Sequence, residues 1–107
     1  MGDSLNRKPI HYAVILENSK AMELLIKHGA DLKDFDKKKM TPLMLAAQAG
    51  RYKNIKYILE KIRDHQYLNF KGEDGLAAIH YATIGKHQEC NSLLIDDPLI
   101  DKEISTK

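Results

Sequence analysis

The chain has 107 residues and a mass of 12.2 kDa, which leaves room for one ordinary domain and excludes a large multi-step enzyme. It is 43% hydrophobic and 30% charged, a globular composition, and its net charge of +2 is not the basic excess typical of nucleic-acid-binding proteins. It has a single cysteine, no secretory signal core near the start, and no apolar run of the roughly 18 to 20 residues that span a membrane. We therefore expect an intracellular protein, most simply cytoplasmic and with a nuclear location left open, whose partner is neither nucleic acid nor membrane.

Three segments of the chain repeat one pattern. Residues 8–13 read KPIHYA, residues 41–46 read TPLMLA, and residues 77–82 read AAIHYA, so successive copies are offset by 33 and 36 residues. A period of this length is typical of repeat architectures, in which a single unit is too small to have its own core and neighbouring units share one. The pattern predicts about three such units in series.

Local signals predict a pair of helices in each unit. In the first unit, Gly29 is expected to end the second helix in a left-handed conformation. In the second unit, Thr41 can cap a helix whose first residue is Pro42. In the third unit, Gly75 is expected in the preceding hairpin turn, and residues 77–78 are both alanine, so that the helix loses its cap and should start less firmly.

The second unit departs from the period. Ten residues separate Ile58 from Leu68, whereas seven separate Leu25 from Leu32 in the first unit. The three additional residues fall in a segment, 61–67, that contains no glycine or proline. We expect either a longer second helix or an altered turn that protrudes from one side.

The repeated segments resemble the Thr-Pro-Leu-His-x-Ala signature of ankyrin repeats. In the first unit, residues 23–32 are similar to the second helix of that family and the Gly-Ala-Asp turn that follows it, and Asp36 stands where the next repeat usually opens with an aspartate. The resemblance covers almost the whole chain. It implies an all-α repeat solenoid of paired antiparallel helices joined by β-hairpin-type finger loops. The single domain, 1–107, would contain repeats at about 3–35, 36–71 and 72–101 and a polar tail at 102–107.

The residues that could carry chemistry favour structural roles. His11 and His80 fall on the signature histidine, which the resemblance implies is a structural residue that hydrogen-bonds the loop backbone, as Pro9 and the capping and turn residues also serve the fold. His87 and Cys90 are three residues apart on one predicted helix, but two ligands are too few for a metal site, and a buried apolar thiol is the better interpretation of Cys90. No motif places a nucleophile beside a base, and residues 72–75 are not a phosphate loop. We expect no catalytic residue, metal, cofactor or small-molecule substrate.

The family resemblance implies that the chain binds another protein through its finger tips and the concave face of its first helices. On this chain that surface would comprise Leu5, Arg7, Ile15, Leu16, Lys37, Lys38, Met40, Gln48, Ala49, Glu73, Asp74, Leu76 and Ile84. Its apolar members would form an exposed track typical of an interface, unless some of them are buried under adjacent fingers. The lysines of the second finger are either a solvated tip or a contact for an acidic partner. The acidic finger at 73–74 has the opposite sign.

The sequence leaves the identity of the partner and the setting of the repeats open. The leading interpretation is a non-catalytic protein-interaction module that is a monomer or part of a longer repeat array. One alternative is a segment of a larger protein, in which the repeats dock or regulate a catalytic domain. A second is a small regulator of a cytoskeletal protein, because residues 7–13 and 36–45 are also similar to the corresponding stretches of the myotrophins.

Overall fold

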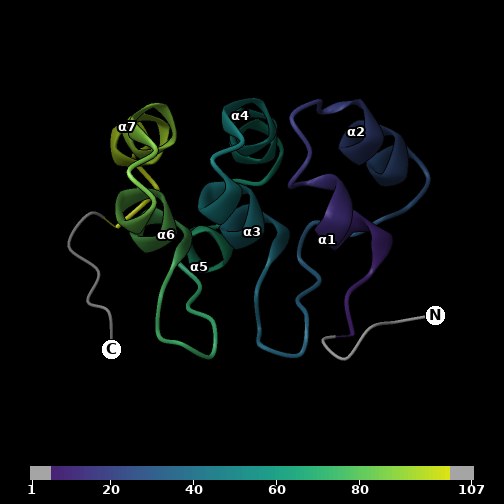
Figure 1. Cartoon of the computed structure of the whole chain (residues 1–107), viewed down its shortest axis with the longest axis horizontal. Coiled ribbons are helices and arrows are strands. Elements are labelled where there is room, and N and C mark those ends of the chain that lie inside the picture. Colours follow the sequence, from purple (N-terminus) through teal and green to yellow (C-terminus); the bar gives the residue numbers. More distant parts are fainter. Residues whose placement is uncertain (1–5, 102–107) are drawn as a thin grey trace.

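A computed structural model describes residues 6–101, and in that range the chain forms three helix pairs that stand side by side (Figure 1). The inner row contains α1 (Pro9–Ala13), α3 (Pro42–Ala49) and α6 (Ala78–Ile84), and the outer row contains α2 (Lys20–Lys27), α4 (Tyr52–Lys61) and α7 (Gln88–Asp96). A short helix, α5 (His65–Leu68), follows α4. Residues 6–101 contain no strand, and the loops that enter α3 and α6 extend on the same side of the stack. This is the all-α repeat fold that the sequence predicts.

The central helix α3 shows how these residues specify a helix. The Thr41 side chain accepts a hydrogen bond from the backbone nitrogen of Met44 at 3.3 Å, which satisfies one of the free donors of the first turn. Pro42 occupies the first helical position, where its missing N–H costs nothing. Gly50 ends the helix with φ +74°, a left-handed conformation that glycine adopts without steric cost. Between these ends, residues 42–47 are all buried, because α1 and α6 lie on either side.

The start of α6 differs from that of α3 as the alanine pair at 77–78 predicts. Ala77 has no side chain that can cap the helix, and it is the ring of His80 that accepts the backbone hydrogen bond of Ala77, with 2.9 Å between nitrogen atoms. The helix therefore begins at the equivalent residue without the hydroxyl cap.

The additional residues of the second unit form an altered turn. Helix α4 ends at Lys61, so the expectation of a longer second helix is wrong. Asp64 caps α5 by accepting a hydrogen bond from the backbone nitrogen of Gln66 at 3.0 Å. The turn does not protrude as expected, because Tyr67 and Leu68 are buried and the Tyr67 hydroxyl donates a hydrogen bond to the carbonyl of Leu32 in the first unit. The inserted residues thus tie two units together.

Polar side chains at the start of α4 and of α7 bind the unit that precedes each helix. Arg51 Nε donates to the carbonyl of Ile15 at 2.6 Å, and Asn54 Nδ2 donates to the carbonyls of Val14 and Leu16 at 2.7 and 2.9 Å. One unit later, His87 occupies the position equivalent to Arg51, and its Nε2 lies 3.1 Å from the carbonyl of Gln48, the equivalent of Ile15. The same backbone acceptor is thus satisfied at both junctions by different side chains.

Candidate functional site

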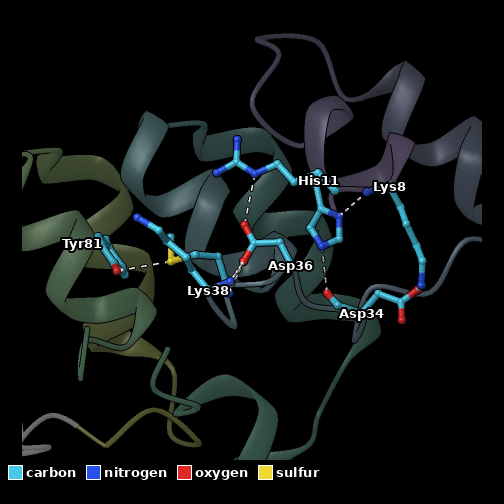
Figure 2. Close-up of polar contacts among 8 residues, drawn as sticks. Lys8, His11, Asp34, Asp36, Lys38 and Tyr81 are labelled. Atoms are coloured by element: carbon cyan, nitrogen blue, oxygen red, sulfur yellow. Dashed lines mark hydrogen bonds and ion pairs between the residues drawn. The ribbon is translucent and has the colours of Figure 1, made fainter. Parts of the chain in front are cut away.

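The finger between the first two units is built around one buried carboxylate. Asp36 is 2% exposed, and its Oδ1 accepts hydrogen bonds from the backbone nitrogens of Lys38 and Met40 at 2.8 and 2.9 Å. Its Oδ2 accepts from Arg7 Nε at 3.1 Å, in an ion pair between the first unit and the second. Figure 2 shows Asp36 pointing into the turn, with Lys38 beside it. The finger is therefore held in one shape by its own carboxylate.

The tip of each finger turns through a left-handed residue at the same position of the repeat. Lys39 has φ +60° and Gly75, its equivalent in the third unit, has φ +77°. Asn6, the equivalent in the first unit, has φ +56°. A glycine adopts this conformation freely, whereas a lysine is held in it by the surrounding hydrogen bonds.

The second and third fingers are joined to each other. The backbone nitrogen of Glu73 donates to the carbonyl of Lys38 at 2.9 Å. Within the third finger, Gly72 occupies the position of Asp36 and closes the turn through backbone hydrogen bonds alone, from its nitrogen to the Leu76 carbonyl and from Gly75 to its own carbonyl. The two tips therefore keep a fixed spacing.

The two joined tips carry opposite charge. The side chains of Lys37, Lys38 and Lys39 are exposed at one tip, and those of Glu73 and Asp74 are exposed at the next. The contrast extends over whole units, since residues 36–71 contain nine basic and three acidic residues, and residues 72–101 contain one basic and six acidic residues. A net charge of +6 thus lies beside a net charge of −5.

The signature histidine of the first unit supports the finger that follows it. His11 is 1% exposed; its Nδ1 accepts from the backbone nitrogen of Lys8 at 2.9 Å, which leaves Nε2 to donate to the carbonyl of Asp34 at 3.1 Å (Figure 2). The ring therefore connects α1 to the next finger. Lys8 and Asp34 also form an ion pair at 3.1 Å across the same junction. Both ring nitrogens of His11 are thus engaged in positioning the loop.

The structure places the predicted partner-binding residues in different environments. The exposed ones are Leu16, Lys37, Lys38, Gln48, Glu73, Asp74 and Ile84, and the partly buried ones are Arg7, Ile15, Ala49 and Leu76. Leu5 lies outside the described residues. The prediction of an exposed Met40 is wrong: it is 7% exposed, and the Tyr81 hydroxyl of the next unit lies 3.3 Å from its sulfur atom (Figure 2).

The predicted apolar track is consequently interrupted. Ile15 and Leu76 pack against the core and Met40 belongs to it, so the large apolar side chains left exposed on this surface are Leu16 at one end and Ile84 at the other. What remains between them is polar and charged. The surface is better described as a charged pair of finger tips with an apolar side chain beyond each end.

Sequence reasoning missed an apolar groove at the first unit. Its volume is about 480 Å³, and it is lined by Arg7, Pro9, Tyr12, Ala13 and Leu16. Tyr12 is 42% exposed, whereas Leu45 and Tyr81, at the equivalent positions of the other units, are 3% and 7% exposed. The signal that could have found it is the repeat register, which places Tyr12 at the position of Leu45 and Tyr81, on the side of the inner helix that faces the preceding unit.

The described residues contain no group of three or more His, Cys, Asp or Glu side chains arranged to hold a metal ion. Cys90 is 2% exposed, and its burial raises the pKa of the thiol above the usual value. His87 lies between Gly50 and Gly85, where a β-carbon on Gly50 would approach within 2.5 Å of the imidazole Nδ1. Across residues 6–101, no helix has the length and apolar character needed to cross a membrane.

Comparisons with known proteins agree with this architecture. Residues 1–71 match the family model described as "Ankyrin repeats (3 copies)". The chain is 32% identical over 93 residues to inversin of Gallus gallus, and 33% identical over 95 residues to the nuclear factor NF-kappa-B p105 subunit of Rattus norvegicus. These matches cover 87% and 89% of this chain but only 8% and 10% of the two relatives. The chain is also 26% identical over 120 residues to poly [ADP-ribose] polymerase tankyrase of Caenorhabditis elegans. That match spans 97% of this chain and 5% of the tankyrase. The chain belongs to the ankyrin-repeat family.

Proposed function

We propose that this chain is a non-catalytic module that binds a protein partner through its second and third finger tips and the adjoining ends of the inner helices. Ankyrin repeats are generally protein-protein interaction modules. The observation that carries the proposal for this surface is the pair of joined tips, which hold Lys37 and Lys38 beside Glu73 and Asp74 at a fixed spacing. A rigid surface binds with little loss of conformational freedom.

The charge pattern specifies the chemistry of the partner. A partner with an acidic segment next to a basic segment would satisfy both tips, whereas a uniformly acidic chain, including nucleic acid, would be repelled by Glu73 and Asp74. Leu16 and Ile84 would add apolar contact at the ends. We propose an intracellular location for this binding, because Cys90 is an unpaired and buried thiol.

A second candidate role is supported by the lengths of the relatives. The matches span a tenth or less of inversin and of the p105 subunit, so the chain corresponds to one stretch of each of these larger proteins. In a protein of that kind, the repeats would position a catalytic or regulatory domain. The role of a myotrophin-like regulator of a cytoskeletal protein stays a prediction. All three roles use the same surface and differ in the partner.

The test compares two charge reversals on one folded chain. The finger variant Lys37→Glu/Lys38→Glu and the matched control Lys53→Glu/Lys56→Glu, on the exposed face of α4, change the net charge equally. Proteins captured from a cell extract by the wild-type chain are identified by mass spectrometry, and their affinity for each purified variant is measured by interferometry. We expect the finger variant to weaken binding at least about tenfold, roughly 1.4 kcal/mol, and the α4 control to leave it nearly unchanged. Equal binding by the finger variant, or equal loss with the control, would place the site elsewhere.

A further inference from the structure

The charged side chains of the second and third finger tips have no ion-pair partner among residues 6–101. Charged residues at the junctions between units are paired, as Lys33 is with Asp64 and Arg63 is with Asp97. The tip residues are exposed and take part in none of the ion pairs within residues 6–101; they are Lys37, Lys38, Lys39, Glu73 and Asp74. Two tips of opposite sign therefore stand side by side with their charges exposed to solvent.

The spacing of the two tips is fixed. The backbone nitrogen of Glu73 donates to the carbonyl of Lys38 at 2.9 Å, so the tips cannot separate without losing this bond. Figure 1 shows both loops reaching the same level, beyond the helices, on one side of the stack. Another molecule can therefore contact both tips at once.

A positive tip beside a negative tip is complementary to a rotated copy of the same pattern. Two such surfaces can meet face to face in either of two orientations. In the parallel orientation, each tip faces the tip of like charge and is repelled. When one molecule is turned by 180° about an axis that passes midway between the tips, each positive tip faces the negative tip of the other molecule. The charge pattern therefore favours the antiparallel, two-fold arrangement.

A second copy of this chain matches the surface in spacing as well as in sign. A partner for both tips needs an acidic segment next to a basic one, and the distance between the two segments must equal the distance between the tips. A copy meets this condition by symmetry. The match also continues behind the tips, because the two-fold arrangement places the unit of net charge +6 opposite the unit of net charge −5.

We propose that two copies of this chain associate through their second and third finger tips about a two-fold axis, with Lys37 and Lys38 of each copy facing Glu73 and Asp74 of the other. The proposal rests on the surface of the proposed function and names a second copy as a partner for it. The contact is small and consists of exposed ion pairs, so the pair is weak and sensitive to salt. Because pairing covers the tips, another protein that binds there must displace the copy.

Sedimentation velocity of the purified chain from about 10 µM to about 1 mM, in about 20 mM salt, tests the pairing, because a weak dimer grows with concentration. We expect a monomer–dimer equilibrium that is weakened at least about tenfold by Lys37→Glu/Lys38→Glu, and likewise by raising the salt to about 0.5 M. The matched control, Lys53→Glu/Lys56→Glu on α4, changes the net charge equally and should dimerise like the wild type.

Charge exchange between the tips tests the two-fold arrangement itself. Glu73→Lys/Asp74→Lys should also abolish self-association, because both tips are then positive. Mixed with Lys37→Glu/Lys38→Glu, in which the second tip carries the opposite charge, it should form a heterodimer. A variant with all four substitutions has the net charge of the wild type and a reversed pattern, and it should dimerise again. The substituted side chains are all exposed, and circular dichroism verifies that each variant stays folded.

The outcomes separate this pairing from the proposed function. A wild-type chain that stays monomeric at about 1 mM in low salt, or a dimer that survives Lys37→Glu/Lys38→Glu, overturns the pairing. If the finger variant still loses a captured partner while the wild type is monomeric, the binding surface stands and the second copy is the wrong occupant. If the dimer behaves as expected while captured proteins bind both variants equally, the tips pair copies of the chain and the proposed function fails.

Discussion

Lys39 stands at a position of the repeat where Gly75 stands one unit later, and both adopt the left-handed conformation. An L-residue with a β-carbon is strained there by about 1 to 2 kcal/mol. Asp36 holds Lys39 in this strained conformation. Its carbonyl accepts a hydrogen bond from the Lys39 backbone nitrogen at 2.9 Å, and its carboxylate accepts hydrogen bonds from the residues on either side of Lys39. The second finger therefore keeps a positive charge at its tip at the expense of some stability.

Replacing Lys39 by glycine should raise the free energy of unfolding by about 0.5 to 1 kcal/mol, because the relief of strain exceeds the additional freedom of glycine in the unfolded chain. Urea denaturation of the purified variant measures this difference. Lys38→Gly is the matched control, since Lys38 is equally exposed and has no left-handed backbone, and it should destabilise slightly. A Lys39→Gly variant that loses as much stability as the control would show that the tip is not strained.

At the scale of elements, the junctions between units depend on buried side-chain donors. Asn54 is fully buried and donates to two carbonyls of the turn after α1, whereas its equivalent in the third unit is Cys90, which makes no such pair of bonds among the described contacts. The second junction relies on His87, held between two glycines, for its bond to Gln48. The first junction is therefore more polar than the second.

Asn54→Ala should lower the free energy of unfolding by about 2 to 4 kcal/mol, because it leaves the carbonyls of Val14 and Leu16 without their side-chain donor inside the protein. His87→Ala, the corresponding change at the other junction, removes one partly exposed bond and should cost about 1 kcal/mol. Thermal and urea denaturation of both variants measure the difference. Equal losses would mean that the two junctions contribute alike.

At the scale of the whole molecule, basic and acidic charge are separated along the stack. The Arg63 guanidinium of the second unit binds Asp97 of the third with bonds of 2.7 and 3.0 Å, and Lys33 of the first unit binds Asp64 of the second at 3.0 Å. The hydrogen bond from Lys33 lowers the pKa of Asp64 below its ordinary value of 3.8. Acidic groups in the third unit offset the basic excess of the second.

Acid should therefore destabilise the chain. A carboxylate whose pKa is lowered on folding stabilises the protein above its unfolded pKa and loses that contribution as the pH falls through the folded value, which for Asp64 lies below about 4. At about pH 3 most of the 15 acidic residues are neutral while all 17 lysines and arginines remain charged, so repulsion adds to the loss. Melting temperatures should fall between about pH 5 and pH 3 and recover partly in about 0.5 M salt, which screens the repulsion. A melting temperature that is constant over this range would contradict the prediction.

Periodicity predicts the repeat fold because the recurring positions are set by local helix signals, as Thr41 and Pro42 illustrate at α3. For the end of the second unit, periodicity leaves two possibilities, a longer helix or an altered turn. The choice between them depends on a distant residue, because the Tyr67 hydroxyl donates to the carbonyl of Leu32. The same limit explains Met40. Its position in the finger suggests exposure, but its burial depends on Tyr81, which lies 41 residues later. The charged tips follow from local sequence, whereas the groove at Tyr12 depends on how the side chains of the first unit pack.

The carbonyl groups of Val14 and Leu16 have a consequence for synthesis of the chain. The donor that satisfies them, Asn54, is incorporated 40 and 38 residues later. Because residues enter a nascent chain one at a time, at roughly 5 to 20 each second, the first helix pair is translated seconds before its turn can be closed. During that interval the turn after α1 lacks its hydrogen-bond donors and one side of the first helix pair lacks its packing partners. The first unit therefore completes its native contacts only after the second unit has been translated.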